Sequence, residues 1–141
     1  MDKYIGDSIM AFWGAPAPAE DHVQRACRAA LSIRRAIALD NERRSVRGET
    51  PVRVGVGIHT GAAIAGNIGA PGRINYTLVG DTVNIAQRLE ELTKHYGMAD
   101  SVEILISAEV SVRLGPGFVR SLRGSHELRG RHGAVEVSRL D

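Results

Sequence analysis

The stretch from Val52 to His59 constrains the fold more than any other part of the sequence. Its apolar residues occupy every second position, and the residues between them are arginine, glycine or histidine: Val52, Val54, Val56 and Ile58 alternate with Arg53, Gly55, Gly57 and His59. Successive side chains of a strand point to opposite faces, so this period of two predicts a β-strand. A long helical pattern precedes it, from about Glu20 to about Arg44, with apolar residues at steps of three and four. The stretch after this helix is the cleanest strand pattern in the sequence.

The other predicted elements follow from period and turn residues. A hairpin is expected around Gly6-Asp7 and a polar loop over 43–50. Gly61 is expected to turn the chain into a strand over 62–68, which would pair with the alternating strand. The rest are a strand over 74–79, a helix from 80–82 to about 97, a strand over 103–106, a helix over 108–114, a strand over 117–122 and a hairpin joining 126–128 to 135–137. The expected buried face of the second helix comprises Val83, Ala86, Leu89, Leu92 and Tyr96. Helices that alternate with antiparallel pairs favour an α+β sandwich.

Length and charge bound the class of protein. A chain of 141 residues fits one domain, and a formal charge of +2 gives no large field of one sign that would attract nucleic acid or an anionic membrane. The lone Cys27 is predicted to be a small buried thiol. No apolar stretch approaches the roughly 20 residues that span a bilayer. We therefore expect a soluble, cytoplasmic domain, and a membrane anchor elsewhere in a longer parent protein is compatible with the sequence.

Two sets of polar residues could carry chemistry. Asp7 is expected at the tip of a tight hairpin, where a carboxylate can bind a hard divalent cation, although most aspartates in such turns face water. Asp81 stands where a helix N-cap is expected. Asn84 and Arg88 are four residues apart and share one helical face, where they could hold a ribose and an α-phosphate. A solvated helix edge, with Glu91 pairing Arg88, explains the same residues equally well.

Other chemistry-bearing residue types show no motif. The glycines Gly61, Gly66, Gly69 and Gly72 match neither a Walker nor a dinucleotide fingerprint, and turns explain them better. The five histidines are scattered, and each is expected to be structural or exposed: His22, His59, His95, His126 and His132.

Two long segments together resemble the class III adenylate and guanylate cyclases. Residues 2–14, DKYIGDSIMAFWG, are similar to the metal-binding hairpin of that family. Residues 56–90, VGIHTGAAIAGNIGAPGRINYTLVGDTVNIAQRLE, are similar to its central block. The resemblance covers nearly the whole chain in the family's order. It implies a ferredoxin-like nucleotidyl cyclase fold with an antiparallel sheet and flanking helices, and a domain spanning 1–141.

The resemblance also implies roles for individual residues. Asp7 matches one of two metal-binding aspartates, and Lys3 with Asp81 matches the pair that reads the adenine edge. Asn84 would orient the ribose, and Arg88 would stabilise charge on the α-phosphate. The segment from Glu127 to Arg131 resembles a late Leu-Lys-Gly-Lys motif, so Arg131 would contact the triphosphate. Guanylate cyclases typically carry a glutamate at the lysine position and a small or thiol residue at the aspartate position, so this pair favours ATP over GTP.

The implied reaction is the conversion of ATP to 3′,5′-cyclic AMP and pyrophosphate. The resemblance implies two Mg²⁺ or Mn²⁺ ions, a site shared between two catalytic domains in a homodimer, and covalently attached regulatory domains. The family's opening strand, which supplies the other metal aspartate, has no match in this sequence. We therefore expect this chain alone to be inactive or nearly so, and to recruit a neighbour by swapping or edge pairing. The alternative is a non-catalytic nucleotide-binding or dimerisation module of a larger signalling protein, which a longer reading frame upstream of Met1 would disfavour.

Overall fold

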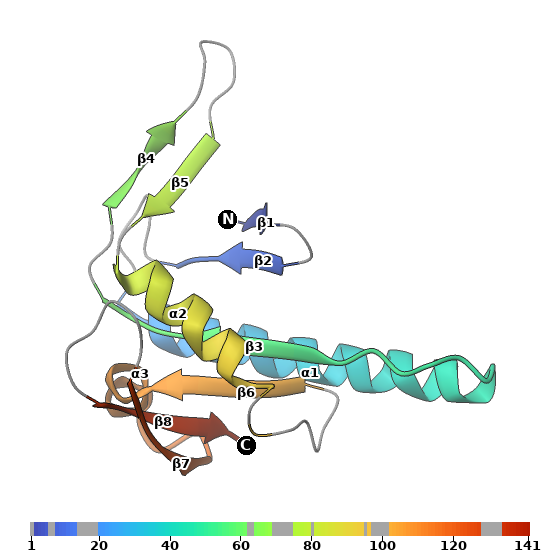
Figure 1. Ribbon diagram of the computed structural model, residues 1–141. Coiled ribbons are helices and arrows are strands. Elements are labelled where there is room, and N and C mark those ends of the chain that lie inside the picture. The colour runs from blue at the N-terminus through green and yellow to red at the C-terminus, as the bar shows by residue number, and fades with distance from the viewer. Residues whose placement is uncertain are drawn as a thin grey trace.

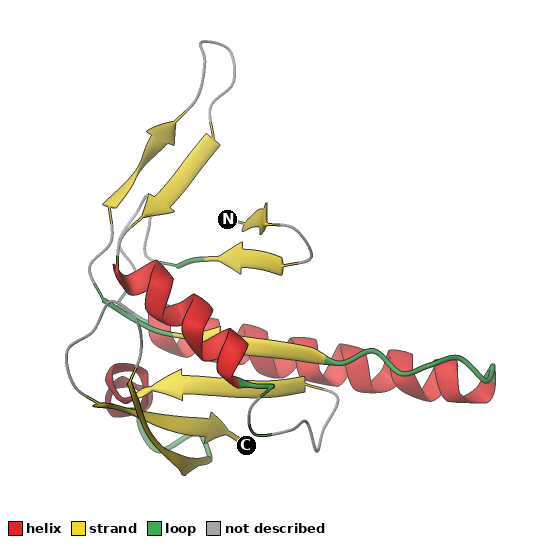
Figure 2. Cartoon of the chain, viewed as in Figure 1, coloured by secondary structure: helices red, strands yellow, loops and turns green. Residues whose placement is uncertain are grey.

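The computed structural model describes residues 2–5, 8–13, 20–61, 64–68, 75–79, 81–94, 96, 102–127 and 134–141. Figure 1 shows how its elements are arranged, and Figure 2 separates helices from strands. In chain order they are β1 (Asp2–Ile5), β2 (Ser8–Ala11), α1 (His22–Val46), β3 (Val54–Ile58), β4 (Ile64–Ile68), β5 (Asn75–Val79), α2 (Asp81–Leu92), β6 (Val102–Ser107), α3 (Ala108–Leu114), β7 (Arg120–Glu127) and β8 (Ala134–Leu140). The fold is therefore mixed α+β, as the sequence predicts.

A four-stranded sheet in the order β3-β6-β8-β7 forms the centre of the molecule. The β3 and β6 strands run parallel, whereas β8 is antiparallel to both β6 and β7. The β1–β2 and β4–β5 pairs are separate antiparallel hairpins (Figure 1). The sheet is thus mixed, and not wholly antiparallel as expected.

Helices cover both faces of this sheet, and β6 shows how the sequence achieves this. Every residue of β6 is buried. Ile104 and Ile106 pack in a cluster with α1 and α3, whereas Leu105, on the opposite face, packs with Ile85 and Leu89 of α2. In Figure 1, α2 accordingly crosses in front of the sheet while α1 runs behind it. A strand covered on both faces reads as a continuous apolar run, as β6 nearly does.

The alternating pattern of β3 does not mark one buried and one exposed face, because helices cover both faces of this strand. Val54, Val56 and Ile58 pack against the α1 side of the core. The opposite face carries glycines, and a Cβ added at Gly57 would lie 2.3 Å from the backbone oxygen of Ala86 in α2. The backbone of α2 therefore rests directly on the backbone of β3, without an intervening side chain.

Further predicted features differ from the structure in strand pairing, in strand bounds and in helix burial. The strand after Gly61 does not pair with β3: β4 pairs with β5, and the described partner of β3 is β6. Strand β7 begins at Arg120 and extends to Glu127, so the predicted strand over 117–122 is placed too early. On α2, Ile85 is buried and Val83 is only partly buried. The physical reason is the glycine face of β3, which turns the helix so that Ile85 and Leu89 meet Leu105.

Helix α1 ends two residues beyond its predicted limit, with a Schellman arrangement. Gly48 adopts a φ of 72°, which favours glycine, and its N–H donates to Ser45 O at 3.1 Å. The N–H of Glu49 donates to Arg44 O at 2.8 Å. These bonds satisfy carbonyls that the helix end leaves without partners. None of the helices in the described part of the chain combines the length and apolarity needed to cross a membrane.

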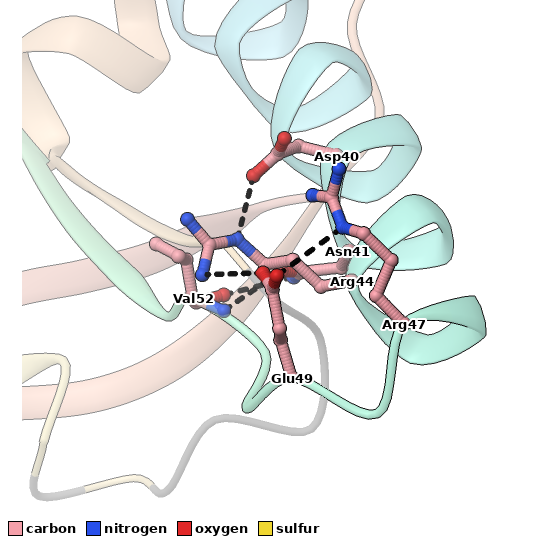
Figure 3. Close-up of polar contacts among 6 residues, drawn as sticks. All are labelled: Asp40, Asn41, Arg44, Arg47, Glu49 and Val52. Atoms are coloured by element: carbon pink, nitrogen blue, oxygen red, sulfur yellow. Dashed lines mark hydrogen bonds and ion pairs between the residues drawn. The ribbon is translucent and has the colours of Figure 1, made fainter.

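Side chains then fix the return of the chain from α1 to β3 (Figure 3). Asn41 donates to Val52 O at 2.9 Å and accepts from Val52 N at 2.7 Å. Ion pairs around it join Arg44 to Asp40 at 2.8 Å, Arg44 to Glu49 at 3.8 Å and Arg47 to Glu49 at 3.3 Å. The paired amide bonds fix the residue two positions before β3, and so help to set where β3 begins.

Cys27 is fully buried in α1, as predicted, and its ionisation gives a pH-dependent test of the core. Burial raises the pKa of the thiol from 9.0 to about 11, partly offset by the nearby charge of Arg120. The folded thiol therefore keeps its proton at pH values where the unfolded thiol loses it, so stability is intact below pH 9 and falls as pH rises toward 11. Between about pH 8 and about pH 10.5, we expect the free energy of unfolding to fall by about 2 kcal/mol more than in a Cys27→Ala variant. Urea unfolding of both proteins measures this, and equal losses would contradict it.

Candidate functional site

Helix α2 carries three of the residues predicted to act on a substrate. Asp81 is its first residue, and the side chain of Asp81 lies outside the described set. Asn84 is exposed, and Arg88, one turn further along, is partly exposed. The structure thus brings these three residues to one helix, with the two described side chains open to solvent. Because α2 rests on Gly57 of β3, the helix is a rigid platform for them.

Arg88 makes the ion pair that the sequence offered as an alternative explanation. Its Nη1 lies 2.8 Å from Glu91 Oε2, and the two side chains are 31% and 48% exposed. Exposed pairs of this kind contribute only about 0–1 kcal/mol, so releasing Arg88 toward a phosphate costs little. The pair is therefore compatible with both a structural and a substrate-binding role.

The remaining predicted site residues are only partly described. Lys3 lies in β1 opposite Met10 of β2, which confirms the predicted hairpin strands, but its side chain is outside the described residues. Asp7 and Arg131 also lie outside them. The structure therefore does not place these three side chains relative to α2.

The described residues do not form a metal site by themselves. They contain no group of three or more histidine, cysteine, aspartate or glutamate side chains that could hold an ion. Asp7, the predicted ligand, lies outside the described residues.

The histidines that the structure describes take structural positions, as expected. The Nδ1 atom of His59 lies 2.8 Å from Ser107 Oγ and 3.2 Å from Glu109 Oε2, and the side chain is 4% exposed. His22 lies 2.9 Å from Thr60 Oγ1. His126 contacts the hydroxyl of Tyr96. His95 and His132 are outside the described residues.

Glu103 is a buried charge that sequence reasoning missed. Its side chain, 1% exposed, lies 3.5 Å from Arg139 of β8 and 3.7 Å from Arg123 of β7. The prediction treated Glu103 only as the first residue of a strand. Its partners come from strands later in the chain, so no local signal marks it. The ion pairs connect β6 to the two following strands on the face that α2 covers.

Comparisons with known proteins give one consistent result. A family model described as the adenylate and guanylate cyclase catalytic domain matches residues 3–138. Adenylate cyclase 1 of Rhizobium meliloti is 35% identical over 135 residues, which are 96% of this chain and 20% of that protein. The guanylate cyclase soluble subunit beta-2 of Rattus norvegicus is 37% identical over 127 residues, or 90% of this chain and 17% of that protein. The chain thus spans a fifth or less of the length of these two relatives.

Solved structures agree in fold. The crystal structure of the adenylyl cyclase CyaB from P. aeruginosa superposes with a TM-score of 0.84 at 28% identity, over 99% of this chain and 70% of that one. The similarity therefore extends through the whole described fold, including the α2 platform.

Proposed function

Because the chain belongs to the adenylate and guanylate cyclase catalytic domain family, we propose that it works on ATP and forms 3′,5′-cyclic AMP and pyrophosphate. In the described part of the chain, the four-stranded sheet and the three helices correspond to the ferredoxin-like cyclase fold of its structural neighbours. In the proposed reaction the ribose 3′-oxygen attacks the α-phosphorus, the bond from that phosphorus to the bridging oxygen breaks, and pyrophosphate leaves. The proton of the 3′-hydroxyl passes to solvent or to the leaving group.

The arrangement of α2 is the observation that carries this proposal. Asn84 is exposed one turn before the partly exposed Arg88, so an amide and a guanidinium lie on one side of the same helix. An amide can both donate to and accept from ribose hydroxyls. A guanidinium can donate two hydrogen bonds to phosphate oxygens as negative charge develops on them. Asn84 would thus orient the sugar, and Arg88 would stabilise the transition state after leaving Glu91.

The preference for ATP rests on Lys3 and Asp81. Adenine presents a ring nitrogen that accepts a hydrogen bond and an amino group that donates one. A lysine ammonium donates and a carboxylate accepts, so this pair suits adenine. The relatives include guanylate cyclases as well as adenylate cyclases, so base selectivity is the finer part of the proposal.

The metals and the second subunit belong to the same proposal. Cyclases of this family generally use Mg²⁺ or Mn²⁺, and Asp7 is the residue we propose as a ligand, with Arg131 on the triphosphate. We further propose that two copies form the site together, in a cytoplasmic catalytic domain that includes residues 1–141. Asp7 is the one residue among these 141 that matches the family's pair of metal aspartates. We therefore expect the 141-residue chain by itself to turn over poorly.

The test is cyclic nucleotide formation from ATP and from GTP with Mn²⁺, in the 141-residue chain and in a chain lengthened by any coding sequence that precedes it. We expect cyclic AMP from the longer chain and little product from the shorter one. Robust turnover by the 141-residue chain would contradict the expected need for a further ligand. Silence in both chains, with folding and dimerisation intact, would favour a nucleotide-binding or dimerisation module instead.

Base selectivity is tested in whichever chain turns over. The double substitution Lys3→Glu with Asp81→Cys reverses the proposed donor and removes the proposed acceptor. We expect the ratio of kcat/KM for ATP to that for GTP to fall by at least about 100-fold, since a site built to hydrogen-bond one base rejects another strongly. An unchanged ratio would show that other residues read the base.

A further inference from the structure

Three consecutive residues directly after β3 each lie against the beginning of a different helix. They are His59, Thr60 and Gly61, which we refer to as the His59–Gly61 segment. The parallel strands β3 and β6 end at the same edge of the sheet, and β6 leads directly into α3. The segment therefore lies where the beginnings of the helices can meet, and its contacts explain how they are held in register.

The first contact joins the segment to α3 through His59. Its imidazole is almost completely buried, with Nδ1 at 2.8 Å from Ser107 Oγ and 3.2 Å from Glu109 Oε2. A carboxylate can only accept a hydrogen bond, so Nδ1 carries the hydrogen and donates it. Ser107 is also the N-cap of α3, because its Oγ accepts from Val110 N. The imidazole is thereby fixed in one orientation by two groups at the start of α3.

The second and third contacts join the segment to α1 and α2. Thr60 Oγ1 lies 2.9 Å from Nε2 of His22, the first residue of α1. A Cβ added at Gly61 would lie 2.8 Å from Thr82 Oγ1 in the first turn of α2, and 3.6 Å from His59 Nε2. The Nε2 edge of the imidazole thus lies near the place where Gly61 meets α2. No side chain at position 61 separates them.

From these contacts we infer that His59 is a positioning residue for the start of α2. Because the start of α3 holds His59 in place, His59 in turn limits where Gly61 can lie. Gly61 adjoins Thr82 in the first turn of α2, next to Asp81. The glycine face of β3 fixes the body of α2, and the His59–Gly61 segment fixes its first turn. The inference about substrate rests on the proposed function, because it assumes that Asp81 reads the base. The inference about the position of α2 stands independently of that role.

Hydrogen exchange of the chain tests the structural part without any activity. The amides of Ile85 and Ala86 lie in the second turn of α2, where each can donate to the carbonyl four residues earlier. We expect His59→Leu to speed exchange at Ile85 and Ala86 by at least about 10-fold while exchange at Ala30 in α1 changes little. His59→Asn should restore most of the protection, because its amide can donate from nearly the same place as Nδ1. Val112→Thr, at an exposed position of α3, is the matched control.

If His59→Leu speeds exchange throughout the chain, the substitution has destabilised the whole fold. Glu109→Ala is then the variant to measure, because Glu109 is partly exposed and its loss removes only one partner of the imidazole. Faster exchange confined to the start of α2 in that variant supports the inference. Wild-type exchange at Ile85 and Ala86 in both variants overturns it.

Base selectivity tests the functional part in a chain that turns over. We expect His59→Leu to lower the ratio of kcat/KM for ATP to that for GTP by about 10-fold, since small displacements of a positioned group weaken discrimination. A loss of folded protein lowers both activities equally and leaves this ratio unchanged. If the Lys3→Glu, Asp81→Cys double variant changes the ratio and His59→Leu does not, the positioning role toward the base is wrong. If neither changes it, the assignment of Asp81 fails, and hydrogen exchange alone decides whether His59 positions α2.

Discussion

Replacing Arg88 with alanine is expected to lower kcat for cyclic nucleotide formation by about 100- to 1,000-fold, with a smaller change in KM. The reason is that a donor aimed at charge that develops only in the transition state contributes little to binding the ground state. Arg88 is partly exposed and its present partner is on the same helix, so the substitution removes no buried contact. Steady-state kinetics with ATP, in the chain that turns over, measures the effect.

Glu91 provides the matched control for Arg88. Glu91→Gln removes the charge that holds Arg88 in the free chain but leaves the guanidinium in place. We expect kcat to stay within about 3-fold of the wild-type value, since an exposed pair contributes at most about 1 kcal/mol. Arg88→Lys should recover only part of the activity, because an ammonium lacks the planar fork of the guanidinium. Equal losses in the Arg88→Ala and Glu91→Gln variants would show that the ion pair, and not a substrate contact, matters.

Replacing Gly57 with alanine is expected to destabilise the fold by about 3 kcal/mol or more. The added Cβ would lie 2.3 Å from Ala86 O and 2.4 Å from Glu90 N, and both are backbone atoms of α2. Backbone cannot rotate away as a flexible side chain can, so the whole helix must move from the sheet. Thermal unfolding should show a Tm lower by about 10 °C for a chain of this size.

Gly117→Ala separates this steric effect from the general effect of replacing a glycine. A Cβ at Gly117 meets nothing within 4 Å. We expect its stability to stay within about 0.5 kcal/mol of wild type, with any change in the stabilising direction, because alanine restricts the unfolded chain. Similar losses in both variants would mean that the contact between β3 and α2 is looser than the structure indicates.

The sequence predicted local elements well because their signals are local. Helix α3 occupies the predicted residues, and the strands that flank Gly6-Asp7 form the predicted hairpin. Strand pairing was predicted less well. Nothing near Gly61 indicates that β3 pairs with β6. That pairing depends on how α2, which lies between the two strands in the sequence, packs on the sheet. The glycines of β3 allow α2 to approach the strand closely. A glycine in the sequence does not show, however, which element will pack against it.

The same distinction applies to the site. Asn84 and Arg88 could be predicted as site residues because one motif contains both, and the structure places both on α2. His59 could not be linked to Ser107 and Glu109, since their contact joins segments almost fifty positions apart. Glu103 was missed for a related reason, because its arginine partners belong to β7 and β8. Residues proposed to bind a substrate can be read from a motif, whereas the contacts of buried polar residues depend on tertiary structure.

The parallel pairing of β3 with β6 has a consequence for synthesis of the chain on the ribosome. Residues 59–101 separate the two strands, and β6 is the partner of β3 in the described part of the protein. At about 5–20 residues per second, β3 and the apolar side of α1 wait several seconds before β6 emerges. During that interval the valines of β3 and the edge of this strand are open to other chains. We therefore expect chaperone binding to nascent chains to be strongest before residue 107 has left the exit tunnel, and to decline once β6 can close the sheet.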